Sequence, residues 1–307
     1  MNTKFTKPKG FGEILDHTFS LTKDHFKNFF IIFLIFMAPI FLIEAIIQLA
    51  SGTSFFRETG QGSNWFEQML SSFEQSGTFD SSSLTSDLAL ILTGLVSFFL
   101  YPVAEGAILF ALNHIRKEEQ YTVGKVIKQA FGRYWPMLGS SILFGLIAFG
   151  IAIIPLILVG VAGGVTAAFI HPVVGVLIGI LFFLGAALGI GLLLTRWSFY
   201  FGSVVLDRVS PGLSRSWRLS KKQTWKLFGL YIVFYMIISA VSFAVEMSFG
   251  LLLGGSVLLS IIRNIITLFT TMFFSVGYGV MYLDLKLRHD ADDLKELIDD
   301  YNMPIHS

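Results

Sequence analysis

The chain has 307 residues, of which 54% are hydrophobic and 14% are charged, and its mean hydropathy is +0.70. Because soluble proteins carry about 25% charged residues, this composition excludes an ordinary water-soluble domain and a disordered chain. The 22 basic and 21 acidic residues nearly cancel, which excludes a basic nucleic-acid-binding domain, and the absence of cysteine excludes disulfides, thiolate metal sites and a cysteine nucleophile.

Six apolar segments are long enough to cross a membrane as helices. A crossing needs about 20 mostly apolar residues. The run of 62 uncharged residues from Tyr134 to Thr195 is long enough for two crossings, with a turn expected between Gly163 and Pro172. These runs lack the alternation of polar and apolar residues that a transmembrane β-barrel needs, so the sequence predicts an all-α polytopic membrane protein. Its six transmembrane helices are expected at residues 28–50, 88–112, 136–162, 172–196, 227–248 and 258–283.

The distribution of basic residues predicts the orientation in the membrane. Of the 22 lysines and arginines, 20 lie in residues 1–27, 114–135, 196–226 and 285–307. Positive residues favour the cytoplasmic side, so we expect a protein of the cell membrane with both termini in the cytoplasm. The outer loop, residues 51–87, is Ser-rich and net acidic. Its apolar spacing fits a short helix on the outer surface, and a loop without regular structure fits equally well.

Three amphipathic segments, which are too polar to insert, each precede a pair of membrane spans. The first begins at Phe11 and the second at Val123, whereas the third begins at Ser210, with Pro211 at the first helical position. Basic polar faces combined with aromatic residues are typical of helices that lie in the membrane interface. A single membrane domain, 1–307, is therefore expected to contain three parallel repeat units, although any even-span protein with basic loops would give a similar pattern. The units cover residues 11–112, 121–206 and 211–284.

The basic interfacial segments predict membrane lipids as partners. Anionic lipid attracts a basic segment by about 1 kcal/mol for each basic residue near the surface. The residues expected to bind these headgroups are Lys27, Lys125, Lys128, Arg133, Arg215, Arg218, Lys221, Lys222 and Lys226. The acidic cytoplasmic tail, residues 285–307, fits either a short amphipathic helix that docks on the basic segments or a solvated tail.

Ionisable residues at membrane depth are the candidates for intramembrane polar pairs. A charge there costs about 2.5–3.5 kcal/mol on insertion scales, so a partner or water is expected beside Glu44 and beside each of the others. Glu246 and Arg263 lie towards the outer face on consecutive spans and are expected to pair. Glu105 lies in the cytoplasmic half of the second span, and Arg196 closes the fourth span on the same side, so they are expected to pair as well. Two structural ion pairs and a polar cavity for a substrate or proton both fit this pattern.

No motif indicates a catalytic residue, a metal site or a cofactor. The six histidines form neither an HExxH motif nor a close i, i+4 pair. Gly175 with Gly179, and Gly185 with Gly189, form two GxxxG patterns in the fourth span, which are typical of helix packing.

Three short motifs lie at the beginning, middle and end of the chain. They are FGEILD at residues 11–16, LDR with LSRSWRL at residues 206–219, and YLDLKLR with DL at residues 282–294. Together they resemble bacterial integral membrane proteins named for the membrane domain of glycerophosphoryl diester phosphodiesterase. The resemblance implies a stand-alone member without the hydrolase domain, because this chain has no room for that domain and lacks its His-Arg-Gly start and acidic metal cluster.

Two functions remain as alternatives. The first is a non-enzymatic accessory or regulatory protein that acts on envelope lipids or on a membrane partner, for instance in envelope-stress or peptide-toxin defence. The second is a small-solute or lipid transporter or flippase with a polar pathway near Glu105 and Arg196. An intramembrane enzyme is a weaker third reading, because no His/Asp or Ser/Lys set stands out. A membrane-protein partner or a homo-oligomer is consistent with each of these functions.

Overall fold

The computed structural model describes residues 5, 7–56, 84–169, 172–254 and 256–302. Every regular element in these residues is a helix. The short helices are α1 (Phe11–Asp24), α5 (Val123–Phe131), α8 (Tyr200–Leu206), α9 (Leu213–Ser220), the π-helix η2 (Glu246–Gly250) and α11 (Leu251–Leu253). The long helices are α2 (Phe26–Ala50), α4 (Leu84–Lys117), α6 (Tyr134–Phe169), α7 (Pro172–Trp197), α10 (Thr224–Val245) and α12 (Val257–Asn302). The surface helix expected within the outer loop falls on residues 57–83, outside the described residues.

Among the described residues, six helices are long and apolar enough to cross a membrane, which confirms an all-α, multi-pass membrane protein. They are α2, α4, α6, α7, α10 and α12, at the positions that the apolar segments predict. α6 continues through Gly163 and Gly164 to Phe169, so the connection to α7 lies at the end of the predicted turn region. The helix continues through these glycines because ending it inside the membrane would leave backbone N–H and C=O groups without hydrogen-bond partners in lipid.

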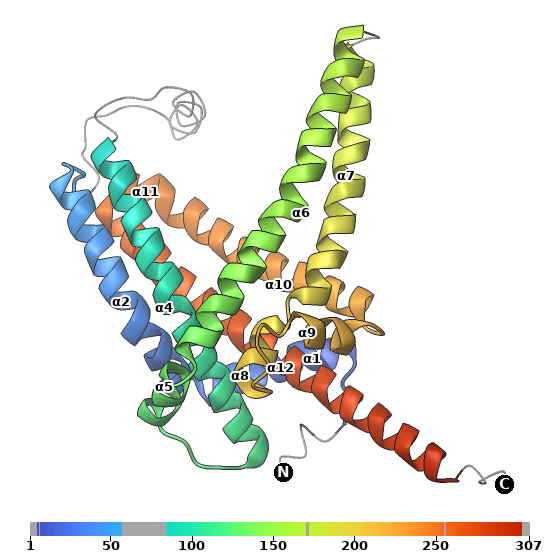
Figure 1. Ribbon diagram of the computed structural model, residues 1–307. Coiled ribbons are helices and arrows are strands. Elements are labelled where there is room, and N and C mark those ends of the chain that lie inside the picture. Colours follow the sequence, from blue (N-terminus) through green and yellow to red (C-terminus); the bar gives the residue numbers. More distant parts are fainter. Residues whose placement is uncertain (1–4, 6, 57–83, 170–171, 255, 303–307) are drawn as a thin grey trace.

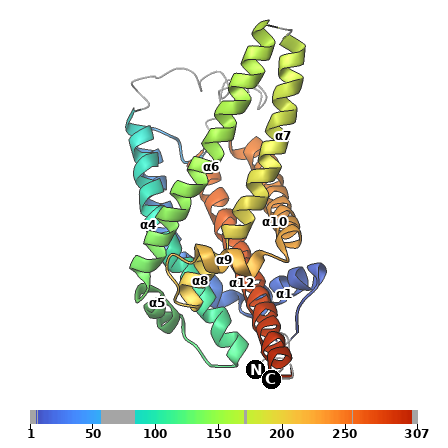
Figure 2. The ribbon, with the colours of Figure 1, turned by 45° about the vertical axis from the view of Figure 1, so that its right-hand side comes forward.

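Short helices precede each pair of long ones: α1 before α2 and α4, α5 before α6 and α7, and both α8 and α9 before α10 and α12. The helices α1, α5, α8 and α9 gather at one end of the bundle in both views (Figure 1, Figure 2). We call this end the basic end and the opposite end the far end. An internal relationship among the three units stays a prediction.

The start of α9 differs from the prediction. The expected cap at Ser210 with Pro211 in the first helical position is wrong, because the helix begins at Leu213 and Gly212 precedes it with a φ of 77°. This left-handed conformation favours glycine. A Cβ at Gly212 would also lie 2.5 Å from the carbonyl oxygen of Tyr200, so the close approach of this turn to α8 requires glycine.

The acidic tail continues the last membrane helix instead of forming a separate short helix. α12 runs without a break from Val257 to Asn302. No glycine or proline occurs between Gly279 and Pro304, so no helix-stop signal separates the tail from the span. The side chains after His289 lie outside the described residues.

The pair formed by α6 and α7 diverges from the other long helices with distance from the basic end (Figure 1). A Cβ at Gly163 would lie 3.5 Å from the carbonyl oxygen of Gly175 and 3.6 Å from Cα of Gly179, so the first GxxxG pattern packs the two helices together. At Gly185 and Gly189 a Cβ would meet nothing within 4 Å, so the second pattern makes no such close contact among the described residues. The most apolar stretch of α6 contains no buried residue. The pair therefore presents its apolar surface to its surroundings.

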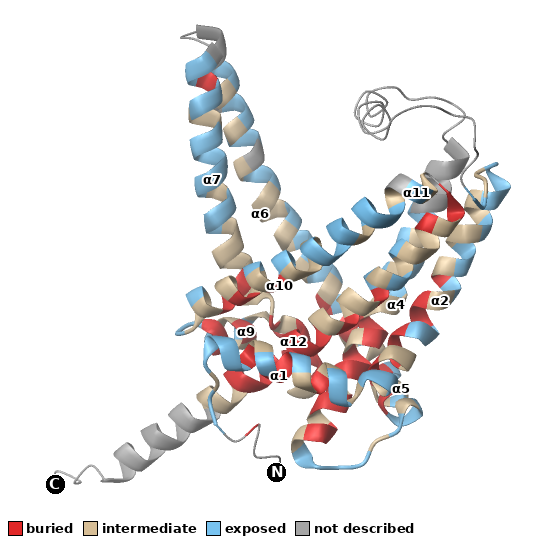
Figure 3. Cartoon of the chain, turned by 180° about the vertical axis from the view of Figure 1, so that it is seen from behind, coloured by how far each residue is buried: buried red, intermediate tan, exposed pale blue. Residues whose placement is uncertain are grey.

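The buried core lies at the basic end (Figure 3). There α12 packs against α1, α2, α4, α9 and α10. The largest fully buried side chains are Tyr282, Phe29, Phe33, Phe199, Phe234, Ile14, Ile32, Ile108, Leu109, Leu112, Met137 and Leu227. Because most of the core lies at this end, the position of the polar groups beside it is determined by tight side-chain packing.

Replacing Gly202 of α8 by alanine is expected to destabilise the basic end. A Cβ there would lie 2.5 Å from Cδ2 of Tyr282, whose ring is fully buried and has no room to shift. Overpacking of this kind costs about 1–3 kcal/mol, so the thermal unfolding temperature in detergent should fall. The control is Gly139→Ala in α6, where a Cβ meets nothing within 4 Å. An equal effect of both substitutions would contradict the packing described here.

Candidate functional site

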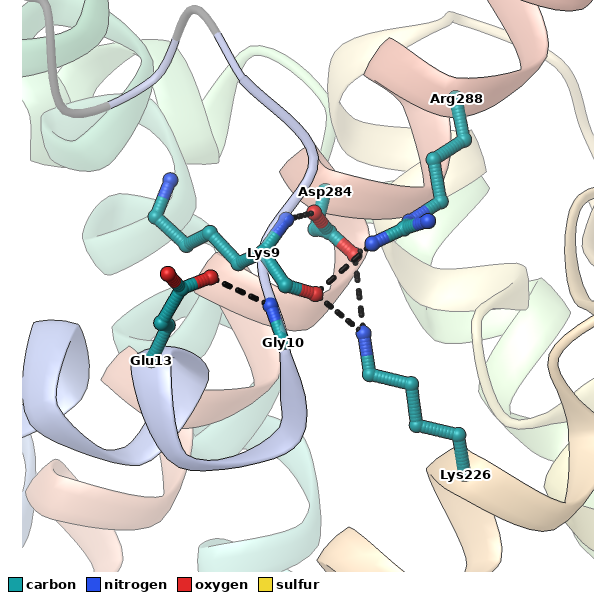
Figure 4. Close-up of polar contacts among 6 residues, drawn as sticks. All are labelled: Lys9, Gly10, Glu13, Lys226, Asp284 and Arg288. Carbon is teal, nitrogen blue, oxygen red and sulfur yellow. Dashed lines mark hydrogen bonds and ion pairs between the residues drawn. The ribbon is translucent and has the colours of Figure 1, made fainter.

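At the basic end, the carboxylate of Asp284 in α12 joins three segments of the chain (Figure 4). Its Oδ1 accepts a hydrogen bond of 2.7 Å from the backbone N–H of Lys9, and its Oδ2 accepts one of 2.9 Å from Nε of Arg288. Nζ of Lys226 in α10 lies 3.6 Å from the same Oδ2. Lys226 and Arg288 also donate to the carbonyl oxygen of Lys9, at 2.5 and 2.7 Å. With a side chain only 4% exposed, Asp284 therefore ties the N-terminal segment to α10 and α12.

A second buried carboxylate, Asp207, follows α8 directly. It forms ion pairs with Lys286 of α12 and with Arg215 of α9, whose Nε donates to Oδ2 at 3.2 Å. Burial by itself would raise the pKa of Asp207, but the hydrogen bond and charge of Lys286, with the charge of Arg215, outweigh it and lower that pKa below its ordinary value. Asp207 is therefore held ionised between α8, α9 and α12.

Both aspartates escaped the search for candidate residues in the sequence, which considered only ionisable groups inside the spans. Arg215 and Lys226, which were expected to face lipid headgroups, have these carboxylates as partners. The available signal was that Asp207 and Asp284 each follow an apolar stretch directly and lie within the motifs LDR and YLDLKLR.

A cavity of about 540 Å³ opens beside α9 at the basic end, and we call it the basic cavity. Its lining residues are Gly189, Leu192, Leu193, Arg196, Trp217, Lys221, Lys222, Gln223, Thr224, Trp225 and Lys226. Four of these side chains are cationic and none is acidic. Nε of Arg196 donates to Oγ1 of Thr224 at 3.2 Å, and its guanidinium lies 4.4 Å from the ring centroid of Trp217. The cavity thus combines held positive charge with an apolar wall.

The predicted pair between Glu105 and Arg196 is wrong. Arg196 lines the basic cavity and contacts Thr224 and Trp217, whereas Glu105 lines a different cavity. Lying on the same side of the membrane does not make two helix ends neighbours: α4 packs mainly on α2, α5 and α12, while α7 packs on α6, α9 and α10.

The cavity at Glu105 has a volume of about 390 Å³, and we call it the aromatic cavity. Its lining residues are Met37, Gly94, Ser97, Phe98, Tyr101, Pro102, Glu105, Ser141, Tyr200 and Phe201. Four of these side chains are aromatic and none is basic. Within the part of the chain that the structure describes, no hydrogen bond or ion pair joins Glu105 to another residue.

At the far end, the predicted pair between Glu246 and Arg263 is present. Nη2 of Arg263 lies 2.9 Å from Oε2 of Glu246, and Nε donates to the same oxygen at 3.2 Å. Both side chains are about half exposed, at 54% for Arg263 and 51% for Glu246. Glu44 accepts hydrogen bonds from Asn264 at 2.9 Å and from Gln48 at 3.2 Å, so α2 is tied to α12. A partner beside Glu44 was expected without being named, and these two amides are that partner.

The remaining residues expected at lipid headgroups lie at the basic end. Six of them are exposed and one, Arg133, is half-buried; the exposed ones are Lys27, Lys125, Lys128, Arg218, Lys221 and Lys222.

Over the described ranges, no group of three or more His, Cys, Asp or Glu side chains could hold a metal ion.

A family model matches residues 30–283, which include Glu105 and Asp207 and end one residue before Asp284. The chain belongs to this family, the Domain of unknown function (DUF7847). No curated protein and no solved structure matches the chain. The family description assigns no activity, so the resemblance to the glycerophosphoryl diester phosphodiesterase membrane-domain family stays a prediction.

Replacing Asp284 by asparagine is expected to release the N-terminal segment. The substitution leaves Lys226 and Arg288 without their shared anion in a poorly solvated place, and breaking a buried pair costs roughly 3 kcal/mol or more. Trypsin should then cleave after Lys9 in native membranes, and the thermal unfolding temperature should fall. The control Asp24→Asn removes an exposed carboxylate from α1 and should change neither measurement. Resistance of the Asp284→Asn protein to cleavage would refute the joining role of this carboxylate.

Proposed function

We propose that the protein is a non-enzymatic accessory or regulatory protein of the cytoplasmic membrane that binds anionic lipids through its basic end. The basic end lies in the cytoplasm in this proposal, because 20 of the 22 lysines and arginines lie in the segments that meet there. The exposed indoles of Trp135 and Trp225 are of the kind that marks the level of the headgroups.

The observation that carries the proposal is the composition of the basic cavity. Arg196, Lys221 and Lys222 supply positive charge without an acidic side chain in the lining, while leucines of α7 supply an apolar wall. The charge of Lys226 is shared with Asp284. An anionic phospholipid has the same arrangement, with a phosphate beside an acyl chain. The cavity therefore offers complementary surfaces to both parts of one lipid molecule.

Arg196 is arranged before a ligand arrives. Its side chain is held by Thr224 and by the ring of Trp217, and its backbone carbonyl accepts hydrogen bonds from the hydroxyls of Ser216 and Ser220 at 2.7 and 3.0 Å. A group that is already held in place loses less conformational entropy on binding. This favours a specific headgroup contact over a purely diffuse attraction to a charged surface.

The exposed apolar surface of α6 and α7 supports a role that involves partners within the membrane. Beyond the basic end, this pair packs on itself and leaves large side chains such as Leu146, Phe149 and Leu181 exposed. Lipid, a membrane-protein partner or a second copy of the chain would each cover this surface. A role in envelope-stress or peptide-toxin defence is consistent with such an accessory protein.

The second candidate function is a transporter or flippase. The aromatic cavity favours it, because an ionisable residue in a cavity at membrane depth is a feature of substrate pathways. Arg196 is not part of that cavity, so a pathway would rest on Glu105 without the arginine. Reconstituted protein that accelerates the flip of a fluorescent phospholipid in liposomes would favour this candidate over the accessory role.

Removing two charges from the basic cavity is expected to weaken binding of anionic lipid. Because a contact to a charged group contributes about 1.5–3 kcal/mol, Lys221→Gln combined with Lys222→Gln should reduce retention of phosphatidylglycerol at least about tenfold, and by more than the control does, measured by native mass spectrometry from mixed nanodiscs with phosphatidylcholine. The matched control is Lys125→Gln with Lys128→Gln on α5, which removes the same charge outside the cavity. An equal loss in both double variants, or no loss in either, would reject the basic cavity as the lipid site.

A further inference from the structure

The aromatic cavity has the opposite character to the basic cavity. It contains one carboxylate, that of Glu105, and the aromatic rings of Phe98, Tyr101, Tyr200 and Phe201, and no lysine or arginine lines it. A carboxylate and aromatic faces both attract cations, the first by its charge and the second by the negative face of the ring. Their convergence in one cavity points to a positively charged ligand.

Glu105 itself has no partner that offsets its charge. It lies in the predicted second span, and in the described part of the chain neither a hydrogen bond nor an ion pair reaches it. By contrast, Glu44 and Glu246, which lie near the far end of the membrane helices, both have partners. An ionisable group at membrane depth is costly without a partner, and a cationic ligand from outside the chain would supply one.

The aromatic wall is held rigidly. The hydroxyl of Tyr200 donates to Oγ of Ser141 at 3.1 Å, and the Tyr200 ring stacks on Phe144 with a centroid distance of 4.6 Å. Phe201 lies edge-on to Tyr200, and its side chain is buried. These two rings of the wall are therefore in position before a ligand binds.

The cavity follows one face of α4. Gly94, Ser97, Phe98, Tyr101 and Glu105 recur at the three- and four-residue spacing of a single helix face. Glu105 lies eleven positions after Gly94, which corresponds to roughly 17 Å along the helix. The volume of about 390 Å³ falls in the range of small-molecule sites. This shape suits an alkyl chain with one polar end.

We propose that the aromatic cavity binds an amphiphile with an organic ammonium group. The ammonium lies at Glu105 among the rings, and the alkyl chain follows α4 towards Gly94. Both a free alkylamine and the amine headgroup of a membrane lipid have this chemistry. The aromatic cavity shares no lining residue with the basic cavity, so this proposal can be tested independently of anionic lipid binding.

The test uses the full chain in nanodiscs of phosphatidylglycerol, which contain no ammonium group. The probes are dodecylammonium with a photoreactive diazirine at the end of its chain and the matched dodecanol. The ammonium probe is expected to label α4 near Gly94. Glu105→Gln should reduce this labelling at least about tenfold, as expected for the loss of a contact to a charged group. Glu44→Gln, the matched control at another intramembrane carboxylate, should leave it unchanged.

A second variant fills the cavity without changing its charge. A Cβ at Gly94 meets nothing within 4 Å, so Gly94→Leu can fold and its side chain should obstruct the path of the alkyl chain. Labelling should fall in this variant at an unchanged unfolding temperature. If Glu105→Gln fails to fold, the labelling of Gly94→Leu tests whether the aromatic cavity binds the probe.

Addition of phosphatidylethanolamine to the nanodiscs distinguishes the two sources of the ammonium group. Competition with the probe supports a lipid headgroup as the ligand, and undiminished labelling supports a free amine. The proposal is overturned if dodecanol labels the protein as strongly as dodecylammonium, or if folded Glu105→Gln or Gly94→Leu is labelled as strongly as the unmodified chain.

Discussion

The low polarity of the membrane interior determines where charge can lie in this protein. Charged residues make up 14% of the chain, and nearly all the basic ones lie in segments that meet at one end of six apolar helices. At that end Asp207 and Asp284 hold the positive side chains in fixed places, and the buried core surrounds them. In the described residues, Asp207 joins α9 to α12 through Arg215 and Lys286, and Asp284 joins α10 and the N-terminal segment to α12.

The number and approximate positions of the membrane helices follow from the sequence because hydrocarbon demands long uncharged helices. The pair between Glu246 and Arg263 is also predictable, since few charges lie near the far end and the two belong to consecutive helices. Rules about segment length and neighbouring charges predict these features because lipid surrounds the helices with the same apolar environment at every position.

Contacts between distant segments are not predictable in this way. The expected pair between Glu105 and Arg196 relied on depth in the membrane alone, whereas their partners depend on which helices pack side by side. Asp284 bonds to a residue 275 positions earlier, and no local pattern contains that information. The start of α9 depends on the approach of Gly212 to α8, which is equally non-local.

The bond between the N-terminal segment and Asp284 also has a consequence for biosynthesis. Lys9 precedes its partner Asp284 in synthesis by five membrane helices and most of the sixth. Closure of the basic end is therefore a late event in assembly. A chain that stops before Asp284 lacks the carboxylate that Lys226 and the backbone N–H of Lys9 share, so the sixth membrane helix must be in place before α10 and the segment at Lys9 are joined through it.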